Sequence, residues 1–487
     1  MIYPSKNEFI RLSKKGNLIP VYKEIAADLE TPVSSFIKID KGDYSYLLES
    51  VEGEEKIARY SFLGSDPSII FKTKGKNIEV IENSKVSRYK TKTDPLDEMK
   101  RFMERYEFVK IKGLPRFCGG LVGYIGYDMV RFFEDIPDNN TDDLGIPDSV
   151  FMLTDTILIF DHMLHKIKIV SNILIQGDPV KAYDSAVKKI KSIEKQLSAN
   201  IKSKKAKGSK GHLKISSNFT EKKFSDIVDK AKEYIKNGDI IQVVLSQRIE
   251  AELGKKDPFG IYRNLRSINP SPYMYYLKFK DMKLIGSSPE IMVRCEDRKI
   301  ELRPIAGTRP RGKDAKEDEE LQRELLADPK ERAEHIMLVD LGRNDVGRVS
   351  QFDTVKVQEL MRIEKYSHVM HIVSDIVGTL SKTCNEYDVV RASFPAGTVT
   401  GAPKIRAMEI IDELENVKRG PYAGCVGYFS FSRNVDTCIT IRTILVKKKK
   451  AYIQAGAGIV ADSEPKKEYK ETLNKAMALI KAIEETV

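Results

Sequence analysis

Apolar residues recur every three or four positions in several stretches of this chain, a spacing that predicts amphipathic helices. The best-delimited stretch covers residues 328–348, where Asp328 and Pro329 stand directly before the periodic residues. An Asp that accepts the first free N–H groups, followed by Pro in the first turn, is typical of a helix start. Thr220 and Gly238 delimit a second helix in the same way. Further helices are expected to begin at Pro95, around Lys188 and at Ile405.

Strands are predicted where β-branched and aromatic residues gather between turn residues. Glycines interrupt one of these runs, residues 118–127, and indicate bulges or close approach of another backbone. Strands and helices are therefore mixed along the chain. The strand-like runs are residues 44–50, 59–63, 118–127, 240–249 and 269–277.

One stretch lacks any residues to bury. After a Lys-rich amphipathic helix, residues 198–214 are polar and rich in Gly, Ser and Lys, a composition typical of linkers. At 487 residues the chain is long enough for two domains. We therefore predict an N-terminal regulatory or structural region, residues 1–197, and a C-terminal catalytic region, residues 215–487.

Composition narrows the class of protein. Apolar content is ordinary at 41% and charge is high at 31%, which is typical of soluble globular proteins. No apolar run has the length of a membrane span or the form of a signal peptide. Five scattered cysteines without a C-x-x-C pair predict reduced thiols and a cytoplasmic protein. The net charge of +11 comes mostly from Lys without interleaved aromatics, which favours a solvated surface over a nucleic-acid site.

Two acidic pairs carry the strongest chemical signal. Glu331 and Glu334 share a helix face with His335, and Glu468 and Glu471 have the same spacing far away in the chain. Two such helices can meet around one hard cation, and magnesium prefers oxygen ligands. The alternative is structural. Glu331 could close a capping box with residue 328, and Glu471 could pair with a Lys four residues later.

Several other polar groups in the C-terminal half suit an anionic substrate. Gln242 lies within a strand, Glu290 follows a turn, and His371 neighbours His368. Two Gly-containing turns offer free backbone N–H groups. A lone Arg in a strand-like run requires an anionic partner. These features lie at residues 303–308, at Arg442 and at Gly456-Ala457-Gly458.

The combination of a divalent cation, several anion-binding groups, His and Glu290 predicts a magnesium-dependent lyase or isomerase acting on a small polycarboxylate. The Gly-rich loop at residues 394–404 does not have the spacing of a nucleotide P-loop, and no Ser-His-Asp arrangement is present. Residue patterns alone do not identify the substrate.

The long ordered motifs resemble a known group of proteins. The chain is similar to the large, chorismate-binding subunits of anthranilate synthase (component I) in the chorismate-utilising enzyme family, over nearly its whole length. This resemblance implies an α+β fold in which antiparallel β-sheets pack as a sandwich with flanking helices, and the N- and C-terminal parts associate around the active site. The motifs are residues 47–64, 238–248, 269–277, 303–312, 331–349, 394–404 and 456–476.

The resemblance also implies roles for individual residues. Magnesium would bind Glu334 and Glu471, with Glu331 and Glu468 alongside. His371 would assist an elimination, and Glu290 would protonate the departing ring hydroxyl, with Thr398 and Gln242 close by. Chorismate would be held by Gly307, Thr308, Tyr422, Arg442, Gly456, Ala457 and Gly458.

The implied reaction adds ammonia to chorismate and eliminates pyruvate, giving anthranilate for tryptophan synthesis. Family members that add water carry a Lys base where this chain has Gln242, and an amide cannot act as a base in that way. Members that make 4-amino-4-deoxychorismate commonly carry a nucleophilic Lys where this chain has Ala306. Both positions favour anthranilate.

The resemblance further implies regulation and a partner. Tryptophan would inhibit by binding at Ser50, Pro272, Tyr273 and Met274, although the residues alone, without the resemblance, favour core packing. The chain contains no Trp, so it could still be made during tryptophan starvation, which gives weak support to a role in tryptophan synthesis. Cys425 lacks the surroundings of an amidotransferase nucleophile, so a separate glutamine amidotransferase subunit (component II) would supply ammonia, in an assembly that we expect to be a heterotetramer.

Two alternatives stay open from the sequence. The chain could be the chorismate-binding component of aminodeoxychorismate synthase, against which Ala306 argues. It could instead be a basic protein that binds RNA or other anions, with structural carboxylates. No membrane partner is expected.

Overall fold

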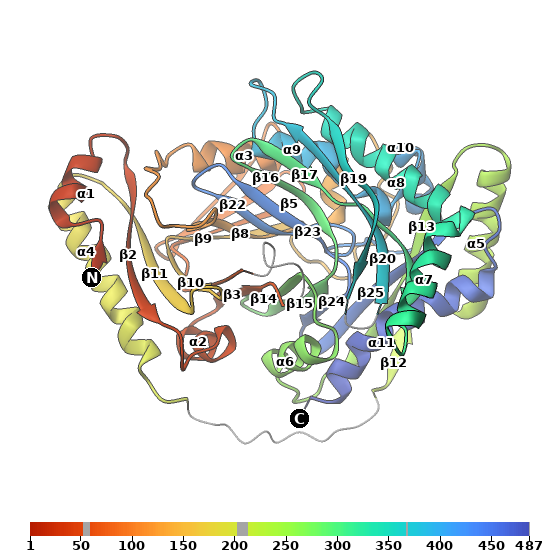
Figure 1. Ribbon diagram of the computed structural model, residues 1–487, viewed down its shortest axis with the longest axis horizontal. Helices are drawn as coiled ribbons and strands as arrows, with labels where there is room; N and C mark the ends of the chain where they lie inside the picture. The colour runs from red at the N-terminus through yellow and green to blue at the C-terminus, as the bar shows by residue number, and fades with distance from the viewer. Residues whose placement is uncertain (52–58, 202–212, 367–368, 487) are drawn as a thin grey trace.

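Two large antiparallel sheets pack face to face, and helices cover their outer faces (Figure 1). This computed structural model describes residues 1–51, 59–201, 213–366 and 369–486. The arrangement confirms the predicted α+β sandwich with flanking helices. Most of the predicted linker lies outside the described residues.

The first sheet draws its strands from both sides of that linker. β3 pairs with β14, so an early strand lies beside a much later one. In order across the sheet, the strands are β1 (Ile2–Tyr3), β2 (Leu18–Ala26), β11 (Lys166–Leu174), β10 (Thr156–Asp161), β4 (Tyr60–Ser65), β3 (Tyr44–Glu49), β14 (Tyr273–Phe279), β15 (Met282–Ser288), β24 (Thr443–Lys447), β25 (Lys450–Ile459), β13 (Gln242–Glu252) and β12 (Ile215–Ser217), with β21 (Gly401–Ala402) paired to β13.

The second sheet is mixed in the same way, because β8 pairs with β22. Its strands in order are β18 (Ile305–Pro310), β20 (Val369–Thr379), β17 (Lys299–Leu302), β16 (Ile291–Glu296), β23 (Val435–Ile439), β22 (Cys425–Ser430), β8 (Gly120–Ile125), β9 (Ser149–Thr154), β5 (Ile69–Lys74), β6 (Asn77–Glu82) and β7 (Lys85–Lys90), with β19 (Lys356–Lys365) on the other side of β20.

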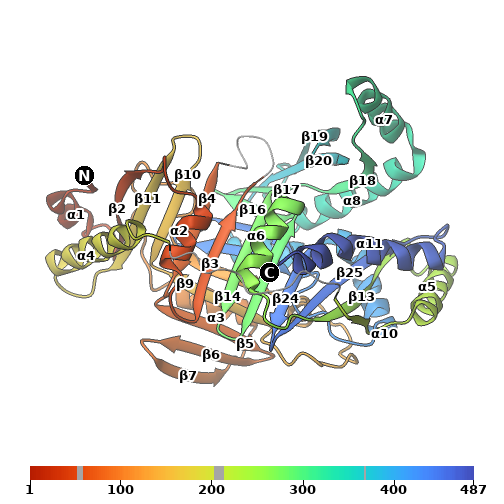
Figure 2. The same ribbon diagram turned by 90° about the horizontal axis from the view of Figure 1, so that it is seen from below.

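The helices lie outside the sandwich, and Figure 2 shows α2, α6 and α11 crossing the face of the first sheet. Thr220, Asp94 and Asp328 cap their helices as the sequence predicts. No helix of the described ranges has the length and apolar character needed to span a bilayer. The helices are α1 (Lys6–Leu12), α2 (Pro32–Ile39), α3 (Pro95–Met103), α4 (Pro179–Leu197), α5 (Glu221–Lys236), α6 (Pro258–Ile268), α7 (Ala315–Ala327), α8 (Pro329–Gly347), α9 (Glu386–Ser393), α10 (Lys404–Leu414) and α11 (Pro465–Glu484), with short 3-10 turns η1 (Tyr127–Phe132) and η2 (Gly397–Val399).

Aromatic side chains fill the space between the sheets. Tyr46 and Tyr275 from the first sheet meet Tyr124 and Tyr428 from the second in one buried cluster. Two further apolar clusters pack helices against the sheets, and one of them contains residues of both sheets. Burying apolar area on both faces of both sheets favours this layered arrangement.

Two local predictions were wrong in detail. Arg442 does not lie within a strand but in the bend between β23 and β24, with a positive φ of 49°. Gly307 does not lie in a turn but forms a bulge inside β18, where the pairing with β20 shifts between Ala306 and Thr308. In both places the strand-like composition continues through a local backbone irregularity that periodicity does not reveal.

Candidate active site

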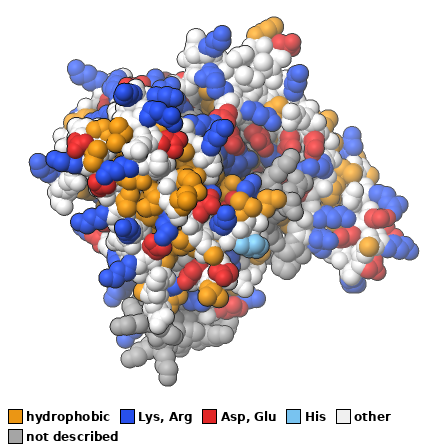
Figure 3. All heavy atoms as spheres, turned by 60° about the vertical axis from the view of Figure 1, so that its left-hand side comes forward, with side chains coloured by type: hydrophobic (Ala, Val, Ile, Leu, Met, Phe, Trp, Pro, Cys, Tyr) orange, Lys and Arg blue, Asp and Glu red, His pale blue; other side chains and the backbone are white. Residues whose placement is uncertain are grey.

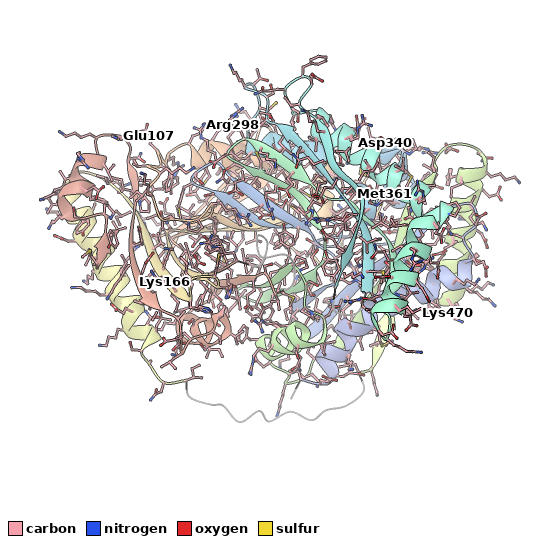
Figure 4. The ribbon with its side chains drawn as sticks, in the orientation of Figure 1. Glu107, Lys166, Arg298, Asp340, Met361 and Lys470 are labelled. Atoms are coloured by element: carbon pink, nitrogen blue, oxygen red, sulfur yellow. The ribbon has the colours of Figure 1, made fainter. Side chains whose placement is uncertain are left out.

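A cavity of about 640 Å³ is lined by β13 and β25 of the first sheet, by β18 and β20 of the second, and by both acidic helices. In Figure 4, Asp340 marks α8 on the upper side of this region, and Lys470 marks α11 on the lower side. Predicted catalytic, substrate and metal residues from distant parts of the chain line this one cavity. They are Gln242, Glu290, Gly307, Thr308, Glu331, Glu334, His371, Thr398, Tyr422, Arg442, Gly456, Gly458, Glu468 and Glu471.

One predicted substrate residue does not line the cavity. Ala457 is fully buried and lies between Gly456 and Gly458 on β25. Neighbouring residues of a strand face opposite sides of the sheet, so the two glycines line the cavity and Ala457 packs into the core on the other side.

The α8 carboxylates face the cavity and already have protein partners. Nε2 of Gln242 donates to Oε1 of Glu334 at 3.1 Å, and Arg309 lies 3.4 Å from Glu331. Asp328 caps α8 through the N–H groups of Lys330 and Glu331. The Glu331 carboxylate therefore points to Arg309 and the cavity, which is not the capping-box arrangement.

The α11 carboxylates face the same space from the other side. Glu471 forms the ion pair with Lys475 that its spacing allows, at 2.7 Å. Burial raises the pKa values of Glu331 and Glu468, and the neighbouring Glu334 and Glu471 raise them further. Crowded, partly buried carboxylates of this kind bind a cation favourably.

These residues fit a hard divalent cation only as part of a larger ligand set. Across the described parts of the chain, no three His, Cys, Asp or Glu side chains are close enough to hold a metal ion by themselves. Magnesium commonly takes one or two carboxylates and completes its shell with water and substrate oxygens. The all-oxygen donors of the two helices are compatible with that mode of binding.

His335 does not join the carboxylates. Although it shares their helix, it is fully buried and its Nε2 lies 2.6 Å from Oγ of Ser374 on β20. Burial lowers its pKa to about 4. It packs α8 against the second sheet and has no place in the cavity.

Glu290 is held as a protonated acid. It follows β15 and is buried in the cavity wall. Burial raises its pKa to about 8, against the smaller lowering effects of the Thr398 hydroxyl and the Lys475 ammonium group. A carboxyl group that keeps its proton at neutral pH can donate it to a leaving group.

His371 has the opposite character. Its Nδ1 lies 3.0 Å from the carbonyl oxygen of Gly307 and 3.0 Å from Oγ1 of Thr308. Because a carbonyl only accepts, Nδ1 must carry the proton, and Nε2 of the neutral ring keeps its lone pair. Burial lowers the pKa of His371, which favours this neutral form. The ring can therefore accept a proton.

The glycines keep the cavity open. Gly307 has a φ of +67°, and a Cβ there would lie 3.1 Å from Oε2 of Glu331. A Cβ on Gly456 would approach the Tyr422 hydroxyl to 2.7 Å, and one on Gly458 would approach Nε2 of Gln242 to 2.7 Å. Side chains at these positions would occupy the substrate space.

Arg442 and Thr398 offer unused polar groups. Nη1 of Arg442 donates to the backbone carbonyl of Lys475 at 2.9 Å. Burial lowers the pKa of Arg442, so an anionic ligand would be stabilised there. Oγ1 of Thr398 is buried beside Glu290 and has no partner in good hydrogen-bond geometry among the described residues. Sequence reasoning missed Arg309 and Gln454, which nothing in their local pattern distinguishes from surface and core residues.

A second, smaller cavity of about 60 Å³ lies between the sheets, and all four residues predicted to bind tryptophan line it. Tyr273 donates to Asp436 at 2.9 Å and accepts from Arg294 at 3.0 Å. Oγ of Ser50 is buried and has no hydrogen-bond partner within the described ranges. The predicted residues are Ser50, Pro272, Tyr273 and Met274.

Comparison with known proteins decides the family. Residues 44–481 match the model of the chorismate binding enzymes. The chain belongs to the chorismate-binding enzyme family. It is 51% identical to anthranilate synthase component 1 of Acetivibrio thermocellus, over 100% of this chain and 99% of the relative. It is 50% identical to the protein of the same name from Aquifex aeolicus, over 99% and 97%.

Solved structures of other proteins have the same architecture. The crystal structure of anthranilate synthase component I from Streptococcus pneumoniae is 36% identical, covers 94% of this chain and 99% of its own, and gives a TM-score of 0.78. The menaquinone-specific isochorismate synthase of Escherichia coli gives 0.72 at 18% identity, with 99% and 98% covered. The second likeness concerns the fold alone.

Proposed function

We propose that this chain combines chorismate with ammonia and eliminates pyruvate to give anthranilate, the first step of tryptophan synthesis. One observation carries the proposal: a single cavity brings together two acidic helices, an acid at Glu290, a base at His371 and an anion-binding Arg442. Chorismate carries two carboxylates and a ring hydroxyl, which these groups complement. The relatives at 50–51% identity have the corresponding name.

Magnesium is the proposed cofactor. Glu334 and Glu471 would bind it directly, with Glu331 and Glu468 beside them. When bound, the ion would neutralise a substrate carboxylate and the charge that develops during the reaction. Oxygen ligands from two helices support this assignment, because the described residues that line the cavity include no Cys or Met and one imidazole, that of His371.

The substrate-binding residues orient chorismate for the first step. Arg442 would pair with one carboxylate, while the backbone at Gly456 and Gly458 lets the ring approach the sheet closely. Glu290 would give its proton to the hydroxyl that leaves the ring as ammonia adds. Nε2 of His371 would then take the ring proton as pyruvate leaves and the ring becomes aromatic.

Two residues of the cavity wall favour ammonia over other nucleophiles. The Gln242 amide donates to Glu334 and cannot deprotonate water. Ala306 lines the cavity but has no amine that could attack the ring. These features support anthranilate over isochorismate and over 4-amino-4-deoxychorismate.

We further propose that ammonia comes from a separate glutamine amidotransferase subunit, in a heterotetramer. Cys425 is buried and burial raises its pKa to about 12, so it is unsuited to act as a glutaminase nucleophile. Basic and acidic side chains are interspersed on the surface seen in Figure 3, which does not favour the alternative of an RNA-binding protein.

The proposal is tested with the purified chain, chorismate, magnesium and an ammonium salt, by following anthranilate fluorescence. We expect a signal that requires magnesium and falls when tryptophan is added. Consumption of chorismate without fluorescence would replace the proposed product by another amino-substituted compound, to be identified by mass spectrometry. Loss of chorismate that does not need ammonium would contradict the proposed nucleophile.

A further inference from the structure

A third cavity adjoins the active-site cavity and takes no part in the functions described so far. It has a volume of about 20 Å³ and lies where β24 and β25 meet residues 419–422. Tyr422 and Gln454 line both cavities, so their side chains form the partition between them. Leu144 lies on its wall, with only 9% of its surface exposed.

Two buried oxygen atoms in this wall are incompletely hydrogen-bonded. Among the described residues, Oγ1 of Thr440 and Oε1 of Gln454 have no partner in good hydrogen-bond geometry, although the residues are only 0% and 7% exposed. The Thr440 hydroxyl interacts weakly with the Tyr275 hydroxyl. Nε2 of Gln454 donates to Oγ of Ser246 at 2.8 Å, which fixes the amide so that its oxygen is the free end. Buried polar atoms are almost always hydrogen-bonded, so these two atoms indicate a bound small molecule.

The size and charge of the cavity restrict what it can hold. About 20 Å³ accommodates one molecule of the size of water. Among the residues that the structure describes, the charged side chains in its lining are two arginines, and none is a carboxylate. Arg419 pairs with Glu415 and Arg248 with Asp143, so these arginines are themselves neutralised. Without a facing carboxylate, a cation would be desolvated and uncompensated, and a neutral molecule is favoured.

We propose that this cavity holds one molecule of neutral ammonia before it enters the active site. The proposal rests on the proposed function, in which ammonia is a substrate. Ammonia can accept a hydrogen bond from the Thr440 hydroxyl and donate one to Oε1 of Gln454, which satisfies both free atoms. Displacement of the Tyr422 or Gln454 side chain joins the two cavities. Ammonia held there is the neutral, nucleophilic form, whereas ammonium predominates in neutral solution.

The test uses the complex of this chain with its glutamine amidotransferase subunit. Thr440→Val removes the hydroxyl with little change of volume. Anthranilate formation is measured once with glutamine and once with saturating ammonium salt. We expect glutamine-driven formation to fall roughly fivefold, as for one lost hydrogen bond, while ammonium-driven formation stays within about twofold. Ammonia released to the medium per glutamine should rise.

The matched control is Thr437→Val, which removes a buried hydroxyl that donates to the Val293 carbonyl outside the cavity. It should leave the ratio of the two rates unchanged. Leu144→Phe provides an independent variant, because it fills the cavity without removing a polar group, and it should lower the same ratio.

The outcomes separate this inference from the proposed function. If wild-type protein makes no anthranilate from ammonium, the proposed function is wrong. If wild-type protein is active and neither Thr440→Val nor Leu144→Phe changes the ratio of glutamine-driven to ammonium-driven formation, the cavity holds a structural water and the ammonia site is overturned.

Discussion

The active-site cavity and the smaller cavity between the sheets differ in the polarity of the residues that line them, although neighbouring strands contribute to both. The first is lined by carboxylates, by glycines and by polar groups such as Arg442 and Thr398 that face the cavity. The second is lined by aromatic rings and by an Arg294, Asp436 and Tyr273 network that is internally hydrogen-bonded. The difference indicates that the first can bind a charged substrate, whereas the second suits a flat, largely apolar ligand.

The two cavities are connected through shared strands. Tyr273 on β14 pairs with Ser288 at the end of β15, two residues before Glu290. Ile439, at the end of the strand that carries Asp436, donates its N–H to the Glu290 carbonyl at 3.0 Å. A ligand that moved β14 or β23 would therefore shift the acid of the active site. This geometry supports the proposal that tryptophan binding at the second cavity lowers activity.

The largest expected effect comes from removing a carboxylate of the first cavity. Glu334→Ala or Glu471→Ala should lower magnesium-dependent turnover by about 1,000-fold, because several kcal/mol of charge stabilisation would be lost. Glu464→Ala, at the exposed start of the same α11 helix, is the control and should retain activity. Wild-type turnover in either cavity variant would remove the metal assignment.

Glu290→Gln should lower turnover by about 100-fold, the lower end of the usual contribution of a general acid. Its pKa of about 8 means that wild-type Glu290 is protonated below that pH and loses its proton above it. At constant free ammonia, kcat/KM should therefore fall as pH rises through about 8. The Gln variant should lack this step, and a step retained in that variant would assign it to another group.

Ser50→Phe should change the second cavity alone. A benzyl side chain would fill its approximately 60 Å³ and exclude tryptophan. We expect turnover within about twofold of wild type, and a tryptophan concentration for half-inhibition raised more than about tenfold, equivalent to about 1.4 kcal/mol. Ser198→Phe, at an exposed helix end, should leave inhibition intact. Wild-type inhibition of Ser50→Phe would rule out this cavity as the tryptophan site.

The smallest expected effect concerns the magnesium requirement. Arg309 lies 3.4 Å from Glu331 and is partly exposed, so its charge is partly screened. Arg309→Gln should lower the magnesium concentration for half-maximal activity about twofold to fivefold, since a competing cation is removed. Calorimetric titration of magnesium checks the same change without turnover. Arg309→Lys keeps the charge and should behave as wild type, and a tighter requirement in the Lys variant would mean that geometry matters more than charge.

Local sequence signals predicted the elements that present the site. Asp328 and Pro329 predicted the start of α8. The spacing of Glu331 and Glu334 predicted that both lie on one helix face, and that face lines the cavity. The direction of His335 could not be predicted, because it depends on Ser374 in a distant strand. The same applies to Arg442, whose bend is set by strands that come together only in the folded protein.

The order of the strands within each sheet could not be predicted from local sequence patterns. Periodicity identifies a strand but not its neighbour, and the pairings of β3 with β14 and β8 with β22 join residues far apart in the chain. The assembly of the cavity from both acidic helices therefore followed from the family resemblance, while the residues themselves indicated only that two acidic helices could share one cation.

The interleaving of early and late strands has a consequence for biosynthesis. β8 emerges from the ribosome long before its partner β22. In the same way, β3 is synthesised long before its partner β14. Closing the long loops between these strands costs conformational entropy before the strand pairing stabilises the fold. Until the strands pair, their unpaired edges stay exposed. We expect this chain to complete its sheets after translation, and to depend on chaperones more than a protein whose domains close one after another.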